Sequence, residues 1–556
     1  MHRVPSAQSQ ATGSHGGAPA ASSSALQRGQ ACFHCRRRKI RCDGARPVCG
    51  PCHRGNRDDD CEYTHGQKRA RAEILQESIT QIERRIAELE NPHQQQAESG
   101  TILLHQAYQS APAPTQRIHS WAPENEPPLD VAEMLIDSFL AYASEFGFFL
   151  NSARFRRSAL QHQSPTRPAP ALLSVVYLWG LRLAKPRPLL ISRSQEPLLL
   201  ARALELAGKG LASAHPQRVL HTLQAEVLLA YYLFSGGRFL EGKYHVAGAV
   251  SLALSSGLQA PAGAGTGALP PVRDAVEAGE RICACWAVVV LDHAWAVALA
   301  ERPHLDLRQV ALATPWPLET ADYERGRVSP AGRSSNTVDD FFAGTPTADT
   351  GTATAALLAK ATLLWQRADI LVRDAPQGTP LGSSSVAFTA LDNLISRFRA
   401  ALPPPSRFPL ATPTMARALV AAHSIAHAAA LQLHHACPGS SSARAAVAAA
   451  RAVLGIVAAA PLPPGGCINP IMGTVWRTAC QVLMDEIATL RMQRQHAQGR
   501  ARGPGDEDSE AALVALLARA LGNLADFAAC PLLKYQISRI QEAFDVMQFS
   551  ACMSAD

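Results

Sequence analysis

The sequence predicts a mostly α-helical protein with a small cysteine-rich module near its N-terminus. Six of the 13 cysteines fall within the thirty residues from Cys32 to Cys61. After Pro127-Pro128, apolar residues recur at helical spacing, and Ala and Leu dominate the long segments that follow. The alternation of β-branched and polar residues that is typical of strands is scarce there. The expected fold is therefore a small module followed by a large all-α region.

Residues 1–27 are rich in Ser, Ala, Gly and Gln and contain few large apolar side chains. Such a composition cannot bury enough apolar surface to offset the entropy of ordering, so we expect a disordered tail. The N-terminus also lacks the apolar stretch of a signal peptide. This predicts a reducing compartment, in which cysteines remain thiols.

The next range, 28–66, carries six cysteines with the spacing C-x2-C-x6-C-x6-C-x2-C-x8-C. Zinc takes four ligands in a tetrahedron, and a Cys-x2-Cys turn aims two sulfurs at one ion. Two zinc sites need eight ligand positions, which six cysteines fill if two of them bridge both ions. The alternatives are a disulfide knot, which needs an oxidising compartment, and a one-zinc ribbon, which leaves two thiolates without a metal.

This stretch resembles the fungal zinc binuclear cluster transcription factors. Besides the cysteines, the matching features are the basic run Arg36-Arg37-Arg38-Lys39-Ile40-Arg41 and Pro47, two residues before the fourth cysteine. The resemblance implies two Zn²⁺ per chain, with Cys32 and Cys49 as bridging ligands. It also implies that Cys35 and Cys42 complete one site, and that Cys52 and Cys61 complete the other.

By the same resemblance, a short helix after the second cysteine enters the major groove of double-stranded DNA and reads CGG-like triplets. Lysine and arginine can donate to guanine O6 and N7, so Lys39 is the first candidate base reader and Arg38 the second. The expected phosphate contacts, which fix register, are Arg36, Arg37 and Arg41, and further DNA contacts are expected from Lys68, Arg69 and Arg71. Three consecutive carboxylates, Asp58 to Asp60, should point away from DNA.

The charge distribution agrees with a DNA-binding module. From Arg28 to Ala72 there are 12 Lys and Arg against 5 Asp and Glu, so this segment carries the whole net charge of +7. The rest of the chain is neutral overall. A localised basic patch is the electrostatic signature of nucleic-acid binding, whereas charge that only served solubility would be spread along the chain.

Range 67–92 predicts a coiled-coil dimerisation element. Its apolar residues recur at alternating intervals of four and three, which is the spacing of a coiled-coil seam. They are Leu75, Ile79, Ile82, Ile86 and Leu89. The alternative is an ordinary amphipathic helix that packs on its own domain. We expect a homodimer, whose two modules would bind two half-sites.

Residues 93–127 are polar and Pro-rich and predict a linker, and range 128–323 predicts a helical domain. Within it, segments 223–258 and 279–305, including Trp286 and Asp292, resemble the fungal transcription-factor regulatory domain, or middle homology region. One departure is Glu301-Arg302-Pro303, where that family has Gly-Arg-Pro. Helical segments are expected at 171–184, 196–213, 216–235, 238–257 and 274–300.

Range 324–352 predicts a low-complexity loop, 353–550 a continuation of the helical domain, and 551–556 a tail. The later helical segments are expected at 353–401, 413–437, 441–459, 471–496, 510–529 and 533–549. The longest apolar run, Ile282 to Ala300, is interrupted by Asp292 and His293. A buried helix is therefore expected there rather than a membrane span.

The chain is predicted not to be an enzyme. Its histidines, such as His245, His304 and His434, are not accompanied by any catalytic motif, and isolated histidines on apolar helices usually belong to a core. The predicted function is a nuclear, sequence-specific regulator of transcription by RNA polymerase II. The resemblance implies the transcription machinery and a small-molecule effector as further partners. One alternative is a zinc-cluster scaffold that binds proteins and meets DNA only non-specifically, and a second is an enzyme with an accessory zinc module.

Overall fold

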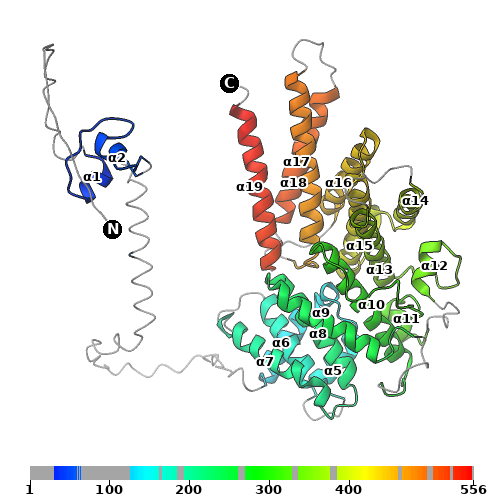
Figure 1. The fold of residues 1–556 in the computed structure, drawn as a ribbon. Coiled ribbons are helices and arrows are strands. Elements are labelled where there is room, and N and C mark those ends of the chain that lie inside the picture. Colours follow the sequence, from blue (N-terminus) through cyan, green and yellow to red (C-terminus); the bar gives the residue numbers. More distant parts are fainter. Residues whose placement is uncertain are drawn as a thin grey trace, which may run out of the picture. The chain divides into compact units, whose positions relative to one another are not determined.

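The computed structural model describes residues 31–58, 60, 61, 63, 80, 126–161, 166–184, 193–260, 269–328, 336–375, 385–460, 466–496, 505–525, 527 and 530–553. The chain divides into two compact units, residues 1–113 and 114–556. Figure 1 shows the helices of both. No strand occurs in the described ranges, which confirms the prediction of a mostly α-helical fold.

The first unit contains α1 (Phe33–Arg37) and α2 (Gly50–Arg54), which pack against each other. The helices of the second unit are α4 (Leu129–Leu140), η2 (Ala143–Phe146), α5 (Ser152–Ala159), α6 (Pro170–Leu183), η3 (Arg193–Gln195), α7 (Glu196–Gly208), η4 (Gly210–Ala212), α8 (Arg218–Ser235), α9 (Phe239–Ser255), α10 (Ala275–Ala298), α11 (Thr320–Glu324), α12 (Thr337–Ala343), α13 (Thr354–Arg373), α14 (Val386–Ala401), η5 (Pro405–Leu410), α15 (Pro413–His435), α16 (Ser440–Ala459), α17 (Met472–His496), α18 (Gly505–Leu524) and α19 (Pro531–Met553).

Local signals set many of these boundaries. The Asp274 carboxylate accepts a hydrogen bond from the Glu277 amide at 2.9 Å and caps the start of α10. Ser385 and Thr412 cap α14 and α15 in the same way. Such caps satisfy backbone N–H groups that have no partner inside the helix. The helix α12 lies within the range expected to be a loop, and there Asn336 supplies the cap.

The turn between α8 and α9 depends on glycine. Gly237 has a φ of 77°, which disfavours residues with a Cβ atom. The amides of Gly237 and Arg238 donate to the carbonyls of Phe234 and Leu233, both at 2.9 Å, which closes the end of α8. The two helices therefore pack against each other.

The end of α10 has the same type of turn although the glycine of the resembling family is absent. Ala300 takes the left-handed conformation with a φ of 55°, and the Glu301 amide donates to the Ala296 carbonyl at 2.8 Å. Buried Asp292 fixes the chain beyond this turn, because its carboxylate accepts from the amides of His304 and Leu305 at 3.0 and 2.8 Å. The role of Asp292 is therefore to hold this turn.

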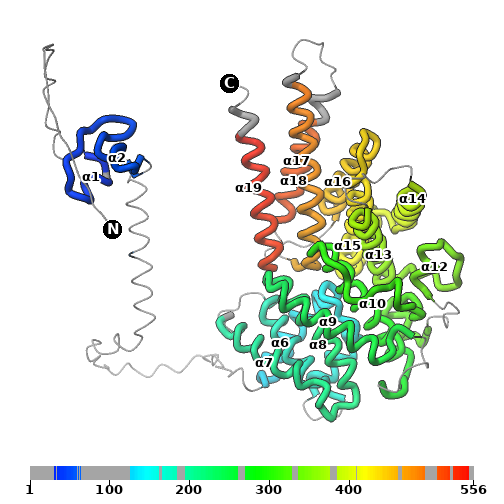
Figure 2. The backbone as a smooth tube through the Cα atoms, viewed as in Figure 1, coloured from blue at the N-terminus to red at the C-terminus, as the bar shows by residue number. Residues whose placement is uncertain are grey.

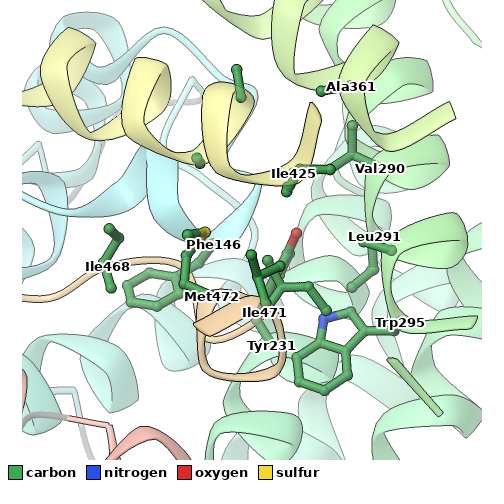
Figure 3. Packing of buried hydrophobic residues seen from close by; sticks show 14 of the residues in the cluster. Phe146, Tyr231, Val290, Leu291, Trp295, Ala361, Ile425, Ile468, Ile471 and Met472 are labelled. Atoms are coloured by element: carbon green, nitrogen blue, oxygen red, sulfur yellow. The ribbon is translucent and has the colours of Figure 1, made fainter. Parts of the chain in front are cut away.

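One continuous hydrophobic core joins the helices of the second unit. In Figure 3, the side chains of Phe146 from η2, Tyr231 from α8, Trp295 from α10, Ile471 from the turn before α17 and Met472, the first residue of α17, lie near one another. Figure 2 shows α16, α15 and α13 as successive neighbours, and α13 packs against α10. Helices from both halves of this unit thus share their apolar faces, so neither half has a separate core.

A buried ion pair connects distant parts of the same unit. The Arg417 guanidinium donates to Glu145 Oε1 at 3.0 Å, and Glu145 Oε2 accepts from the Asn469 amide at 3.1 Å. Both side chains are almost fully buried. Burial raises the pKa of Glu145 above its ordinary value, and the Arg417 guanidinium acts against this shift. Removal of either partner would leave a buried charge without compensation.

Within the described residues, α10 and α16 are long and apolar enough to cross a membrane by length and composition. In α10, 78% of the apolar window is buried inside the fold, and in α16 the value is 44%. The burial of α10 is that of a core helix. This agrees with the expectation of a buried helix rather than a membrane span over Ile282 to Ala300.

Candidate metal centre and nucleic-acid interface

The six cysteines of the first unit lie in two similar halves. Cys32 is the N-cap of α1, and Cys49 is the N-cap of α2. In each half, the second cysteine follows three residues later, in the helix itself. A short helix that begins at a Cys-x2-Cys pair directs both sulfurs to the same side. The two halves thus bring Cys32, Cys35, Cys49 and Cys52 together in the interior of this unit.

Both short helices also end in the same way. Lys39 and Asn56 are left-handed, with φ values of 55° and 53°. The amides of Lys39 and Ile40 donate to the carbonyls of Arg36 and Cys35, and those of Asn56 and Arg57 donate to His53 and Cys52 in the second half. This double hydrogen-bond pattern is a Schellman motif, which usually has glycine at the left-handed position. Local repetition in the sequence is therefore matched by a repeated turn.

The sulfur atoms form two sets of four that share two members. Within each set, all sulfurs lie within 4.8 Å of one another, and the sets are Cys32, Cys35, Cys42, Cys49 and Cys32, Cys49, Cys52, Cys61. The Sγ atoms of Cys32 and Cys49, the shared pair, are 3.7 Å apart. A tetrahedral zinc site with Zn–S bonds of about 2.3 Å has sulfurs about 3.8 Å apart. The spacing of this shared pair fits that geometry.

Other sulfur pairs have similar spacing. Cys35 Sγ lies 3.6 Å from Cys49 Sγ, and Cys32 Sγ lies 3.8 Å from Cys52 Sγ. The Cys35 and Cys52 sulfurs, which belong to different sets, are 3.9 Å apart. All six cysteines are buried and none forms a disulfide. A soft, thiol-only donor set of this kind suits zinc better than it suits hard cations such as magnesium.

Electrostatics favour a cation at the same place. Burial raises the pKa of the Cys35 and Cys52 thiols, and it raises that of Cys61 to about 11. For Cys49, burial acts in the same direction, but hydrogen bonds from the Cys52 amide and from the Cys52, Cys35 and Cys32 thiols lower the pKa to about 6. Several thiolates cannot share so small a volume without positive charge. The donor set therefore fits bound metal ions.

Two residues that the sequence did not single out support this cluster. The Asp43 carboxylate accepts from the Gly50 amide at 3.0 Å and so caps α2 from seven residues away. The Tyr63 hydroxyl donates to the Ala45 carbonyl at 2.9 Å and lies 3.7 Å from Cys42 Sγ. In the sequence, the only local indication of a role for Asp43 is its position next to Cys42, and no local pattern indicates a role for Tyr63.

The basic run forms an exposed surface at the end of α1. All six residues of 36–41 are exposed, including Ile40. Arg36 donates to the Ala31 carbonyl at 3.4 Å. Among the described residues, no carboxylate pairs with Arg37, Arg38, Lys39 or Arg41. Cations that are exposed and unpaired can donate to an anionic partner without breaking internal contacts.

The acidic residues of the second half are engaged within the unit itself. The Asp58 carboxylate lies 3.1 Å from His53 Nδ1, and that of Asp60 lies 3.5 Å from the Arg57 guanidinium. Asp60 also lies 4.0 Å from His34 Nδ1. These contacts offset part of the negative charge of Asp58 and Asp60.

Several predicted residues lie outside the described part of the chain. These are the DNA contacts Lys68, Arg69 and Arg71 and the coiled-coil residues Leu75, Ile79, Ile82, Ile86 and Leu89. Thr80 is described and is helical. The coiled coil therefore remains a prediction.

In the helical unit, the histidines considered as catalytic candidates form pairs that tie neighbouring elements together. His245 Nδ1 lies 2.6 Å from Glu226 Oε2, and His434 Nε2 lies 3.0 Å from Asp392 Oδ1. The space beside Asp292 and His304 measures about 10 Å³, which is about the room for one water molecule. The His245–Glu226 pair joins α9 to α8, and the His434–Asp392 pair joins α15 to α14.

Comparison with known proteins gives one finding. The sequence profile of the fungal Zn(2)-Cys(6) binuclear cluster domain matches residues 30–70. The chain thus carries a zinc-binding domain of the kind that binds DNA in transcription factors. The match does not extend to the helical unit, so the regulatory-domain resemblance remains a prediction. No curated protein and no solved structure matches the chain.

Proposed function

We propose that this protein is a sequence-specific DNA-binding regulator of RNA polymerase II transcription that acts in the nucleus. The observation that carries the proposal is the arrangement of two four-sulfur sets next to an exposed basic run, in which Arg37, Arg38, Lys39 and Arg41 have no acidic partner among the described residues. Zinc bound to the sulfurs would fix α1 and α2 against each other, because structural zinc contributes its binding energy to folding. The basic surface would then be presented in one defined orientation.

Two zinc ions per chain account for the shared members of the sets. Cys32 and Cys49 would bridge, Cys35 and Cys42 would complete one ion, and Cys52 and Cys61 the other. This assignment is supported by the two sulfur sets, which share the same two cysteines that the resemblance makes bridging. The metal supplies positive charge and a tetrahedral geometry, and the chain supplies the thiolates and the supporting hydrogen bonds.

DNA recognition would depend on the turn at the end of α1. Lys39 takes the left-handed position of this turn, and its side chain is exposed. We propose that Lys39 and, next to it, Arg38 donate to guanine edges of CGG-like triplets, while Arg36, Arg37 and Arg41 contact phosphates. Lys68, Arg69 and Arg71 would extend the phosphate contacts beyond the cluster.

The same protein would bind DNA as a homodimer through a coiled coil over 67–92, and the helical unit would regulate it. Two modules on one dimer would occupy two half-sites at a fixed spacing. The support for the dimer is the apolar seam of the sequence, from Leu75 to Leu89. The helical unit has one large shared core. Such a core would couple surfaces at its two ends, as regulation requires.

Competition for DNA tests the proposal. The full chain is bound to a labelled duplex with paired CGG triplets and is challenged with unlabelled copies of that duplex or of random sequence. Base readout predicts a preference of about 10³ or more. Equal competition by both DNAs would favour the alternative, a protein scaffold with only non-specific DNA contact.

Two variants, each with a matched control, test the assigned roles. Lys39→Ala should reduce discrimination at one base pair by about 1–3 kcal/mol, whereas Arg57→Ala, whose guanidinium faces Asp60, should leave it unchanged. Cys49→Ala should lose both metal ions and unfold the cluster, and Cys61→Ala, which removes a ligand of one ion, should retain more zinc. Two zinc ions per chain in Cys49→Ala would contradict the bridging assignment.

A further inference from the structure

A groove on the helical unit opens where four helices meet. Its floor is formed by Trp295, Ala298 and Leu299 at the end of α10, and its walls come from Phe239 on α9 and from the first turns of α17 and α19. The groove has a volume of about 290 Å³. In Figure 1, α19 starts close to α8 and α9, which agrees with the contact between α19 and α8.

Its floor is rigid and aromatic. The Trp295 ring stacks on Phe234 with a centroid distance of 4.0 Å, and Phe239 lies 6.4 Å from both rings. Trp295 and Phe234 are buried in the core. A preformed apolar surface of this kind binds a side chain with little loss of conformational entropy.

Two aromatic side chains of the lining reach the surface. Phe239 on α9 is 37% exposed, and Tyr535 on α19 is 64% exposed. Exposed apolar residues that occur singly need no explanation, but a group beside an apolar groove indicates a binding surface. The volume is at the lower limit for a small-molecule pocket and is closer to what one or two anchoring side chains need.

The charges of the lining are positive. Arg477 and Arg539 line the groove, and no carboxylate does. Arg477 is exposed and has no acidic partner among the described residues. Among the described residues, Arg539 pairs with Glu542, one turn away on the same exposed helix face, and such surface pairs are weak. The groove thus combines an apolar floor with free positive charge.

Nearby acidic groups do not cancel this charge. Glu241, on the first turn of α9, pairs with Arg238, and Glu301, beyond the end of α10, lies 2.5 Å from Lys243. Each carboxylate therefore has its own cation. The positive charge of Arg477 remains available to a ligand.

We infer that this groove binds an acidic amphipathic segment of a partner protein, with large apolar side chains along one face and carboxylates beside them. An apolar side chain of the segment would enter the groove between Phe239 and Tyr535. Its carboxylates would face Arg477 and Arg539. Helical segments that dock in this way present anchors at intervals of three and four residues. This interaction is separate from DNA binding by the first unit.

Peptide binding to the full chain tests the inference. The probe is a fluorescein-labelled 18-residue peptide with Leu and Phe at helical spacing and Glu and Asp elsewhere, and its counterpart carries Gln and Asn at the acidic positions. Fluorescence anisotropy should show saturable binding of the acidic peptide, and binding of the amide peptide should be weaker by about tenfold or more.

Matched variants locate the site. Tyr535→Ser should weaken binding by about tenfold, whereas Leu410→Ser, a change to serine at an apolar residue that is 88% exposed on η5, should have no effect. Arg477→Glu should remove the preference for the acidic peptide. Arg218→Glu is its control, because Arg218 begins α8 and lies about 24 Å along the helix from Phe234. All four positions are exposed, so circular dichroism should show unchanged folding.

Three results would overturn the inference. They are equal binding of the acidic and amide peptides, equal effects of Tyr535→Ser and Leu410→Ser, and no saturable binding of the acidic peptide. Sedimentation of the chain alone adds a further check. If Tyr535→Ser abolishes self-association while peptide binding is absent, a second copy of the chain occupies the groove and the inference fails.

Discussion

The left-handed turn at Lys39 allows stability and DNA reading to be separated by one substitution. A residue with a Cβ atom costs about 1–2 kcal/mol in this conformation, and Lys39 has a φ of 55°. Glycine relieves this cost, but it also raises the entropy of the unfolded chain by an equivalent of about 0.4–1 kcal/mol. Lys39→Gly should therefore stabilise the cluster by roughly 0.5–1 kcal/mol, which is about a two- to fivefold shift in its folding equilibrium.

The second half of the module provides a matched control. Asn56 occupies the corresponding turn of α2 with a φ of 53°. Asn56→Gly should also stabilise the cluster, by a smaller amount because asparagine tolerates this conformation better than lysine. Only Lys39→Gly should lose discrimination between CGG-like and random DNA, since it alone removes a proposed base reader.

Zinc release provides the assay for stability. The full chain and both variants are titrated with a chelator while a chromogenic dye reports free zinc, because metal binding and folding of such a cluster are coupled. Both glycine variants should need more chelator than the parent chain. If Lys39→Gly releases zinc more readily, the argument from backbone strain is wrong. If both variants weaken DNA binding equally, Lys39 is not the base reader.

Three further predictions concern packing and charge. Arg417→Met should destabilise the helical unit by about 3–5 kcal/mol because Glu145 stays buried without its partner. Since burial raises the pKa of Glu145 in the folded state, the variant should lose stability as pH rises through the carboxyl range and regain it on acidification. Urea unfolding at several pH values measures this change. Gly180→Ala should lower the melting temperature, since its Cβ would lie 2.2 Å from a backbone oxygen of α4, whereas Gly455→Ala, with nothing within 4 Å, should stabilise α16 by about 0.5–1 kcal/mol. Gly50→Ala would place a Cβ 2.4 Å from the Asp43 carboxylate that caps α2. Loss of this cap should destabilise the cluster by about 0.5–2 kcal/mol, and the variant should release zinc at a lower chelator concentration.

Each of these has a result that would contradict it. An Arg417→Met variant that is more stable at neutral pH than in acid would refute the assignment of a buried carboxylate. Equal effects of alanine at Gly180 and Gly455 would show that close packing of α4 and α6 is not what requires glycine. Unchanged zinc retention in Gly50→Ala would show that the cap on α2 is dispensable.

Much of the fold follows from local patterns in the sequence. Apolar residues at helical spacing predicted α6, α8, α9 and α10 to within three residues at each end. The range 353–401 was expected to be continuously helical, but the structure has separate helices α13 and α14 there. Ala-rich segments carry little contrast between faces, so periodicity does not show where one helix ends.

Long-range contacts could not be predicted in this way. The Glu145–Arg417 pair joins residues that are 272 positions apart, and nothing in either local sequence identifies the partner. The groove at Phe239 requires four helices to meet, and its positive charge arises only when α17 and α19 are in place. In the cysteine module, by contrast, spacing alone indicated the residues that gather, because only about thirty residues separate the first sulfur from the last.

Selection from a randomised DNA pool tests the central claim most directly. The full chain is incubated with the pool, bound DNA is recovered and sequenced, and the experiment is repeated with a zinc chelator. Paired CGG-like triplets at one spacing, lost on chelation, are the predicted result and would establish metal-dependent readout by a dimer. Recovery of unselected DNA, or of the same sequences with zinc removed, would contradict the claim that the cysteine cluster reads DNA.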